Sequence, residues 1–307
     1  MQLIVVGSIA FDSIKTPFGS IDKTLGGAGT YISLAASFFV KTHGLVSVVG
    51  SNFTDKHFNI FNSRGIDTEG IQLIKNMNTF EWSGEYFNDM NAAKTISTNL
   101  NVMEQFEPQI PEKGKKCKYL ILGSLMPSLQ REIITSFKKR PKLIVLDTIS
   151  YWIKKKRDEL QKTLALVDIL TINDEEARLI SGEYSLVKAA KAIQKMGPAY
   201  VIIKKGENGT LLFYKNKIFF APALPLEEIF DPTGSGDAFS GSFIGYLAKT
   251  KNLYFDNMKR AIIYGSAISS FCVEKFGIQR LQEITNEELN QRFMDHIELV
   301  HFDYIID

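Results

Sequence analysis

Residues 231–239 form the most informative stretch of the sequence and read Asp231-Pro232-Thr233-Gly234-Ser235-Gly236-Asp237-Ala238-Phe239. The small residues at 234–236 stand where a loop turns into a helix, so their N–H groups can converge on an anion at the helix N-terminus. A carboxylate at Asp237 would repel a phosphate, but it suits a base that takes the proton of an attacking hydroxyl. The stretch predicts phosphoryl transfer, with Asp237, Gly234, Ser235 and Gly236 as catalytic residues; a plain loop with a helix cap is the alternative.

Two better-known nucleotide motifs do not fit this stretch. A Walker A loop ends in Gly-Lys-Ser or Gly-Lys-Thr, which is absent here, and Phe239 occupies the place of the third Rossmann glycine. A Rossmann site also normally opens the first βαβ unit, whereas this stretch lies late in the chain. A nicotinamide-dependent oxidoreductase is therefore excluded.

The rest of the chain alternates between short apolar runs and longer amphipathic stretches. Buried strands are expected at Leu3–Val6, Leu45–Val49, Tyr119–Leu122, Leu143–Leu146, Ile169–Ile172 and Tyr200–Ile203. Helices are expected near 28–40, 54–64, 128–139, 150–164, 174–181, 185–196, 235–249, 255–273 and 286–299. This alternation predicts an α/β fold with a mainly parallel sheet.

Two segments interrupt the alternation. Residues 8–25 are rich in turn-forming types, and the segment of about 71–105 includes aromatic, alternating runs typical of antiparallel strands. We expect one domain over residues 1–307, with a small β-rich lid built from about 11–25 and 71–105 to exclude water from the reaction. An ordinary edge hairpin is the alternative for the second segment.

Composition narrows the class of protein. The 307 residues carry 36 Lys and Arg against 34 Asp and Glu, a net charge of +2, which does not suit a dedicated nucleic-acid binder. Cys117 and Cys272 lack zinc or disulfide spacing and favour a reducing compartment. The N-terminus resembles a first strand rather than a signal peptide, and no apolar run approaches the roughly 20 residues that span a bilayer. We expect a cytoplasmic protein with no membrane partner.

Over nearly its whole length the chain resembles the ribokinase-like (PfkB) family of carbohydrate and nucleoside kinases. The family signature, Asp-Thr-x-Gly-Ala-Gly-Asp-x-Phe, corresponds to residues 231–239 here, with departures at Pro232 and Ser235. The resemblance implies a three-layer α/β/α sandwich with a mainly parallel central sheet. It also implies an ATP-dependent kinase that transfers the γ-phosphoryl group to a hydroxyl of a sugar or sugar-containing small molecule.

The resemblance also indicates where ATP and Mg²⁺ would bind. It assigns Asn173, Lys204, Gly206, Gly209 and Thr233 to the nucleotide and gives Glu176 a water-mediated role in holding Mg²⁺. Asn173 and Glu176 alone also fit a helix cap followed by acidic first-turn residues. In many members a monovalent cation such as K⁺ is enclosed near Asp231 and the loop Cys272–Gly277.

Four further residues concern the acceptor. Asp12 matches the family's hydroxyl-binding aspartate, and Gly26 and Gly27 match its Gly-Gly pair. Tyr31 stands where an asparagine is common, so we interpret it either as a stacking partner for a flat nucleoside moiety or as a core residue. A nucleoside kinase and a non-catalytic sugar or nucleotide regulator are the alternative functions. The lid edges allow a homodimer.

Overall fold

The apolar runs of the sequence form the strands of a large sheet in the computed structural model, which describes residues 1–301. Within those residues the sheet has nine strands in the order β13-β12-β11-β10-β9-β8-β1-β4-β5. Their bounds are β1 (Leu3–Val6), β4 (His43–Gly50), β5 (Ile66–Ile74), β8 (Tyr119–Leu122), β9 (Leu143–Asp147), β10 (Ile169–Asn173), β11 (Tyr200–Lys204), β12 (Thr210–Tyr214) and β13 (Lys217–Ala221). Strands from β5 to β11 run parallel, and β12 and β13 extend the sheet as an antiparallel hairpin.

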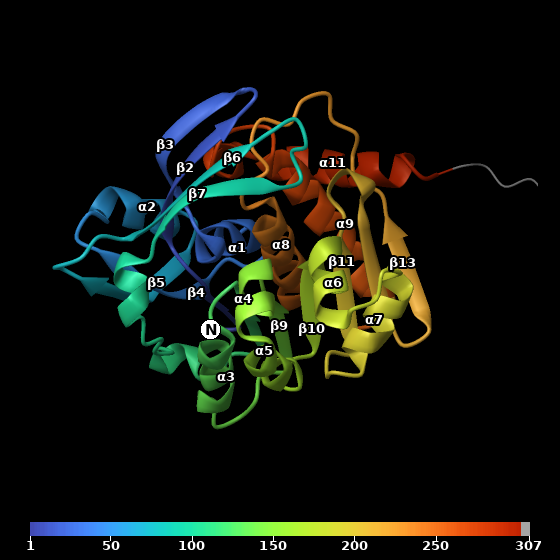
Figure 1. Cartoon of the computed structure of the whole chain (residues 1–307), viewed down its shortest axis with the longest axis horizontal. Helices are drawn as coiled ribbons and strands as arrows, with labels where there is room; N and C mark the ends of the chain where they lie inside the picture. Colours follow the sequence, from blue (N-terminus) through green and yellow to red (C-terminus); the bar gives the residue numbers. More distant parts are fainter. Residues whose placement is uncertain (302–307) are drawn as a thin grey trace, which may run out of the picture.

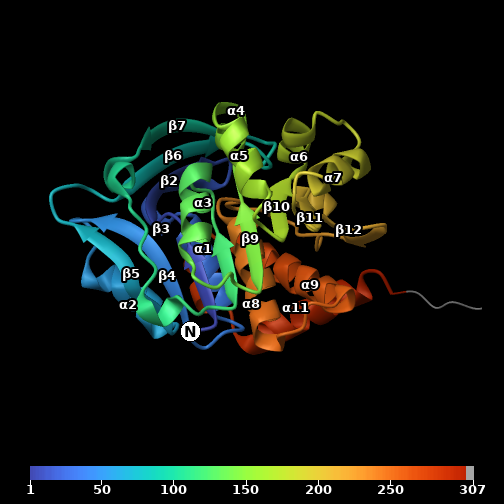
Figure 2. The ribbon, with the colours of Figure 1, turned by 90° about the horizontal axis from the view of Figure 1, so that it is seen from below.

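Helices cover both faces of this sheet, as Figures 1 and 2 show. Successive residues of one strand belong to different cores. Leu3 belongs to the core that includes residues of α1 (Ala28–Ala36), α8 (Ser235–Thr250) and α9 (Phe255–Cys272). Ile4 belongs to the core that includes residues of α3 (Pro127–Ser136), α5 (Arg157–Leu164) and α7 (Leu186–Gln194). This division follows from the two-residue period of a strand, whose side chains alternate between the two faces. The result is the predicted α/β/α sandwich.

Most helices agree with the predicted ranges, with differences at their ends, whereas the short α10 lies outside every predicted range. Their bounds are α1 (Ala28–Ala36), α2 (Asp55–Ser63), α3 (Pro127–Ser136), α4 (Ser150–Lys155), α5 (Arg157–Leu164), α6 (Asp174–Ser181), α7 (Leu186–Gln194), α8 (Ser235–Thr250), α9 (Phe255–Cys272), α10 (Gln279–Glu283) and α11 (Asn286–Glu298). The single helix expected at 150–164 is two helices, because the backbone leaves the helical region at Lys156 (φ −136°, ψ 41°). In the part of the chain that is described, no helix has the length and apolar character needed to cross a membrane.

A second, smaller sheet lies beside the large one. It has the order β3-β2-β6-β7, with β2 (Ala10–Thr16), β3 (Gly19–Gly26), β6 (Phe80–Tyr86) and β7 (Ala93–Asn99). The small sheet includes less of the segment 71–105 than expected, because residues 71–74 continue β5 of the large sheet and Asn101–Gln105 form a short 3₁₀ helix. β5 is an edge strand of mixed burial, so no continuous apolar run marks it as part of the large sheet.

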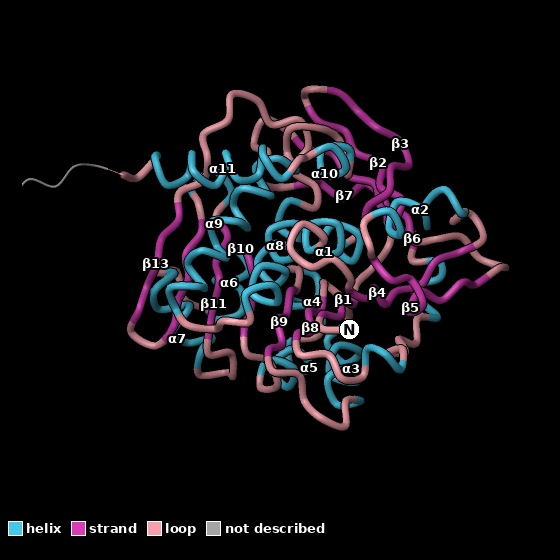
Figure 3. Tube along the Cα trace, turned by 180° about the vertical axis from the view of Figure 1, so that it is seen from behind, coloured by secondary structure: helices cyan, strands magenta, loops and turns pink. Residues whose placement is uncertain are grey.

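The small sheet is attached at the carboxyl edge of the large sheet. The chain passes from the end of β1 through residues 7–9 into β2, and from the end of β5 through residues 75–79 into β6. Figure 3 gives the view from behind, in which the strands of the small sheet lie above and to the right of α1. Ligands of open α/β sheets bind outside the carboxyl ends of the strands, so the small sheet lies next to the expected site.

Candidate active site

Three neighbouring parallel strands end in polar residues at this edge. β9 ends at Asp147, β10 at Asn173 and β11 at Lys204. The register pairs Asn173 with Lys204 and pairs Asp147 with Thr171. Because the carboxyl ends of adjacent parallel strands converge, their side chains meet above one edge of the sheet.

The loop before α8 presents free backbone donors to this edge. Gly234 caps the helix in the left-handed conformation (φ 74°, ψ −2°), and a β-carbon there would overlap the ring of Tyr31. The amide of Ser235 donates to the carbonyl oxygen of Pro232 at 3.2 Å, so the turn already uses one of the three expected donors. Among residues 1–301 the amides of Gly234 and Gly236 have no acceptor, and they remain available to an anion.

Asp237 lies in the first turn of α8, close to the partly buried Lys204. Lys204 Nζ is 3.0 Å from Asp147 Oδ2 and 3.3 Å from the carbonyl oxygen of Gly236. Burial, followed by the negative charge of Asp147, raises the pKa of Asp237 above its ordinary value, against the opposing effect of Lys204. Burial acts against the ammonium of Lys204, but Asp147 and Asp237 outweigh it and the pKa of Lys204 is raised. A permanent cation therefore lies beside a carboxylate suited to accept a proton.

Asp147 is the residue of this cluster that sequence reasoning missed. Its Oδ2 atom accepts hydrogen bonds from Thr171 Oγ1 at 2.7 Å and from Ser240 Oγ at 3.2 Å, in addition to Lys204. These bonds fix the carboxylate and, through it, the direction of Lys204. A usable signal was present, because Asp147 directly follows the apolar run Leu143–Leu146 as Asn173 follows Ile169–Ile172.

Asn173 and Glu176 form the cap at the start of α6. The amide of Glu176 donates to Asn173 Oδ1 at 2.8 Å, and the amide of Asn173 donates to Glu176 Oε2 at 2.9 Å. Burial, and secondarily Asp147, raise the pKa of Glu176 to about 7. The helix-cap alternative is thus realised in the structure, and the same contacts hold Glu176 at the edge where Asp147 and Lys204 meet.

The expected acceptor residues lie where the small sheet joins α1. Asp12 of β2 is buried, and burial together with the charge of Asp231 raises its pKa to about 7, although the amide of Gly27 opposes the shift. A β-carbon at Gly26 would overlap the carboxylate of Asp12. Gly27 has φ +87°, with the carbonyl oxygen of Ser8 2.6 Å from the position of a β-carbon. Both glycines are therefore required for the chain to pass close to Asp12.

Tyr31 is a core residue and presents no exposed ring to a substrate. Its side chain is 1% exposed and packs under Gly234. In the part of the chain that is described, its hydroxyl has no hydrogen-bond partner. Of the two interpretations of Tyr31, the structure favours the second, and a stacking partner must be sought elsewhere.

Asp231 and Thr233 connect the loop to its surroundings. Asp231 Oδ1 accepts from the amide of Thr233 at 2.9 Å, and Oδ2 accepts from the amide of Gly277 at 2.8 Å. The carboxylate thereby joins the loop before α8 to the loop after α9. Thr233 Oγ1 donates to the hydroxyl of Tyr86 at 3.1 Å, so β6 of the small sheet reaches the same loop. Sequence reasoning did not identify Tyr86.

Both hairpin turns of the small sheet also contact this side of the molecule. The ring of Phe18, in the β2–β3 turn, lies 5.5 Å from that of Phe230. Asn91, in the β6–β7 turn, lies next to Gly206, which with Gly209 belongs to the expected nucleotide turn after β11. The small sheet therefore bridges the site from the loop before α8 to the end of β11.

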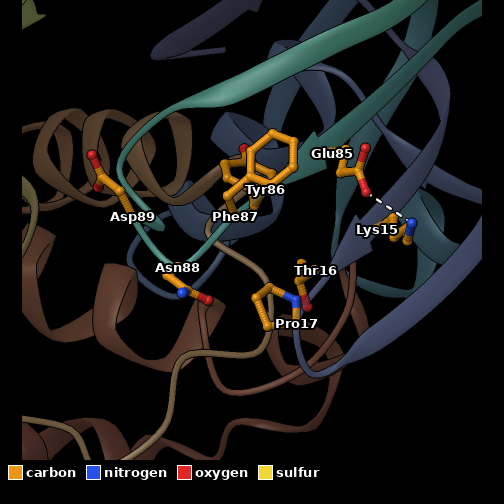
Figure 4. A pocket seen from close by; sticks show the side chains of 8 residues that line it. All are labelled: Lys15, Thr16, Pro17, Glu85, Tyr86, Phe87, Asn88 and Asp89. Atoms are coloured by element: carbon orange, nitrogen blue, oxygen red, sulfur yellow. Dashed lines mark ion pairs between the residues drawn. The ribbon is translucent and has the colours of Figure 1, made fainter.

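A hollow of about 400 Å³ opens between the two hairpin turns. Figure 4 shows Thr16 and Pro17 on one side, Phe87 and Asn88 on the other, and the ion pair between Lys15 Nζ and Glu85 Oε1, which are 2.8 Å apart. Tyr86 lines the hollow and also bonds to Thr233. The hollow therefore begins next to the loop that carries the free amides.

Together these groups suit the transfer of a phosphoryl group to an alcohol. Free amides and Lys204 can stabilise negative charge, and Asp237 can accept the proton of an attacking hydroxyl. A fold and site of this kind define a phosphotransferase that acts on alcohol groups.

Comparisons with known proteins agree with this class. Residues 2–285 match the model of the pfkB family carbohydrate kinases, and the chain belongs to that family. It is 29% identical to the cytidine kinase of Thermococcus kodakarensis over 80% of this chain and 88% of that protein. It is 29% identical to the ribokinase of Haemophilus influenzae over 96% of this chain and 98% of that protein. A solved structure of an Escherichia coli putative ribokinase II with ATP and Mg²⁺ has a TM-score of 0.77 at 20% identity, covering 96% of this chain and 99% of that one.

Proposed function

We propose that this chain transfers the γ-phosphoryl group of ATP to a hydroxyl of a sugar or a nucleoside. The observation that carries the proposal is the position of Asp237, next to the partly buried Lys204 and one residue beyond Gly236, whose amide has no acceptor among residues 1–301. The family of the chain supports the reaction class. The similarity to a cytidine kinase and to a ribokinase supports both kinds of acceptor.

Each residue of the site has a defined part in this reaction. Asp12 holds two hydroxyls of the acceptor, and Gly26 and Gly27 give the acceptor room. Asp237 takes the proton as the hydroxyl oxygen forms its bond to the γ-phosphorus, while the bond to the oxygen bridging the β- and γ-phosphorus breaks and ADP leaves. The amides of Gly234 and Gly236 and the ammonium of Lys204 stabilise the charge on the transferred group.

ATP and Mg²⁺ complete the site in this proposal, and the donors present fit them. The amides of Gly234 and Gly236, which have no acceptor in the described part of the chain, the ammonium of Lys204 and the turn at Gly206 and Gly209 suit the phosphates. Glu176 and Asn173 offer oxygens of the kind that Mg²⁺ prefers. When bound, Mg²⁺ neutralises charge on the phosphates. The E. coli protein solved with ATP and Mg²⁺ supports this part of the proposal.

A monovalent cation such as K⁺ is a further part of the proposal. Both carboxylate oxygens of Asp231 already accept hydrogen bonds from backbone amides. In this proposal the ion is therefore held by backbone carbonyl oxygens of the two loops that Asp231 joins. We also propose a cytoplasmic enzyme with a small-molecule partner, supported by the net charge of +2 and by Cys117 and Cys272, which are free and buried. Nucleic acid and membrane are not proposed as partners.

The reaction is tested by measuring ADP formation from MgATP with ribose, fructose, cytidine and adenosine as acceptors. At least one compound should be phosphorylated, and Asp237→Asn should lower kcat by roughly 10²–10⁴-fold with ATP binding retained. Phosphoryl transfer to none of them would favour the regulator alternative. Near-normal turnover by Asp237→Asn would remove Asp237 from the role of base.

A further inference from the structure

Trp82 lies beside the acceptor-binding aspartate on the inner face of the small sheet. In the parallel pair β2–β6, Trp82 is the register partner of Asp12, and on the other side Asp12 is paired with Thr24. Paired residues of neighbouring strands point to the same face of a sheet. That face is directed to the site, because Thr24 lies against Gly277 and the hydroxyl of Tyr86 bonds to Thr233.

The orientation of the indole is fixed along one edge. Its Nε1 atom donates to Thr95 Oγ1 of β7 at 3.3 Å, and the outer edge of its six-membered ring reaches over Gly84, the register partner of Thr95. A side chain at Gly84 would displace this ring. The polar group of the indole is thus satisfied, and its orientation is set within the small sheet.

No aromatic ring and no cation of the described residues covers a face of this ring. Trp82 is only partly buried. An anchored aromatic side chain with a free face is what a flat ligand group requires for stacking. Tyr31, the residue first considered for that role, is buried under Gly234.

We propose that Trp82 stacks on the nucleobase of a nucleoside acceptor whose ribose diol is held by Asp12. Adjacent strands lie about 4.8 Å apart, and in a nucleoside the base is attached to the carbon next to the diol, so both contacts can be made by one molecule. This inference rests on the proposed kinase function and narrows its acceptor to nucleosides. Trp82 is a specificity residue here and takes no part in the chemical step.

Kinetics with cytidine and ribose as probes test the inference. Trp82→Ala should raise KM for cytidine roughly 10–100-fold, with kcat and the KM for ATP nearly unchanged, and Trp82→Phe should restore most of the loss. Ribose, which has no base to stack, serves as the control: any turnover of ribose should keep its wild-type KM in both variants. An unchanged KM for cytidine in Trp82→Ala would overturn the inference, as would an equal rise for ribose and cytidine.

Binding can be followed without turnover because the chain has two tryptophans, Trp82 and Trp152. Trp152 lies on α4, where its Nε1 atom donates to the carbonyl oxygen of Ser124 at 3.2 Å. In Trp152→Phe the fluorescence comes from Trp82 alone, and cytidine should quench it whereas ribose should not. Trp82→Phe, which keeps Trp152 alone, is the matched control and should show no quenching by cytidine. Quenching in the control but not in Trp152→Phe would overturn the inference.

The two experiments separate this inference from the proposed function. If cytidine quenches Trp82 but no compound is phosphorylated, the stacking is supported and the kinase proposal fails. If cytidine is phosphorylated with the same KM in wild type and Trp82→Ala, the kinase proposal is supported and the stacking fails.

Discussion

At the scale of single residues, the charge state of Asp237 controls the proposed reaction. Burial and the neighbouring Asp147 raise its pKa above the ordinary 3.8. Only the ionised carboxylate can take a proton, so kcat should fall as the pH drops through this raised value, and the acid limb should lie at higher pH than for an exposed aspartate. A pH profile of kcat measures this. Asp147→Asn should shift the limb to lower pH, and an unshifted limb would contradict the assigned cause.

A second residue-scale prediction concerns Gly234, for which the chain provides a matched control. Gly234 and Gly182 both have φ +74°, but a β-carbon at Gly182 meets no atom within 4 Å, whereas at Gly234 it overlaps the ring of Tyr31. Gly182→Ala should lower the free energy of unfolding by about 1 kcal/mol through backbone strain alone. Gly234→Ala should lower the free energy of unfolding by about 1–3 kcal/mol more than Gly182→Ala does, because its methyl group overpacks against Tyr31. If chemical denaturation gave the same loss of unfolding free energy for both variants, the ring of Tyr31 would move aside without a loss of stability.

At the scale of elements, hydrophobic patterning predicted the core strands and most helices, because continuous apolar runs are typical of strands buried on both faces. Hydrophobic patterning failed at an edge strand with mixed burial and at a break between two helices. The edge strand β5 mixes buried and exposed residues and was assigned partly to the small sheet. The break at Lys156 lies inside a charged run with no proline or glycine to mark it.

The start of α6 combines a helix cap with a proposed metal contact, and variants can separate the two. Glu176→Gln retains a side-chain oxygen that can accept from the amide of Asn173, so the free energy of unfolding should change little. The Mg²⁺ concentration needed for half-maximal activity should rise roughly 10–100-fold. Thr285 and Glu288 form the same reciprocal cap on α11. Glu288→Gln is therefore the control and should leave the Mg²⁺ requirement unchanged. An unchanged requirement in Glu176→Gln would leave Glu176 as a cap only.

At the scale of the whole molecule, the parts of the site that sequence reasoning missed depend on pairings between distant segments. Asp237, Asp12 and Asn173 stand in recognisable local motifs. Trp82 and Tyr86 do not, and their places follow from the parallel pairing of β2 with β6 and from the contact with Thr233. No local pattern in the sequence fixes that register. The proposal for the acceptor therefore required the fold, whereas the prediction of the reaction class did not.

The small sheet also provides the edge through which we propose that two copies associate. Every residue of β7 is exposed, and the side chain of Ile96 is 57% exposed. An exposed edge strand with an apolar side chain can pair with a second copy, so sedimentation should show a dimer that Ile96→Lys converts to a monomer. Ile218, on the edge strand β13 of the large sheet, is 52% exposed, and Ile218→Lys should leave the dimer intact. A monomeric wild type, or dissociation only by Ile218→Lys, would exclude association through β7.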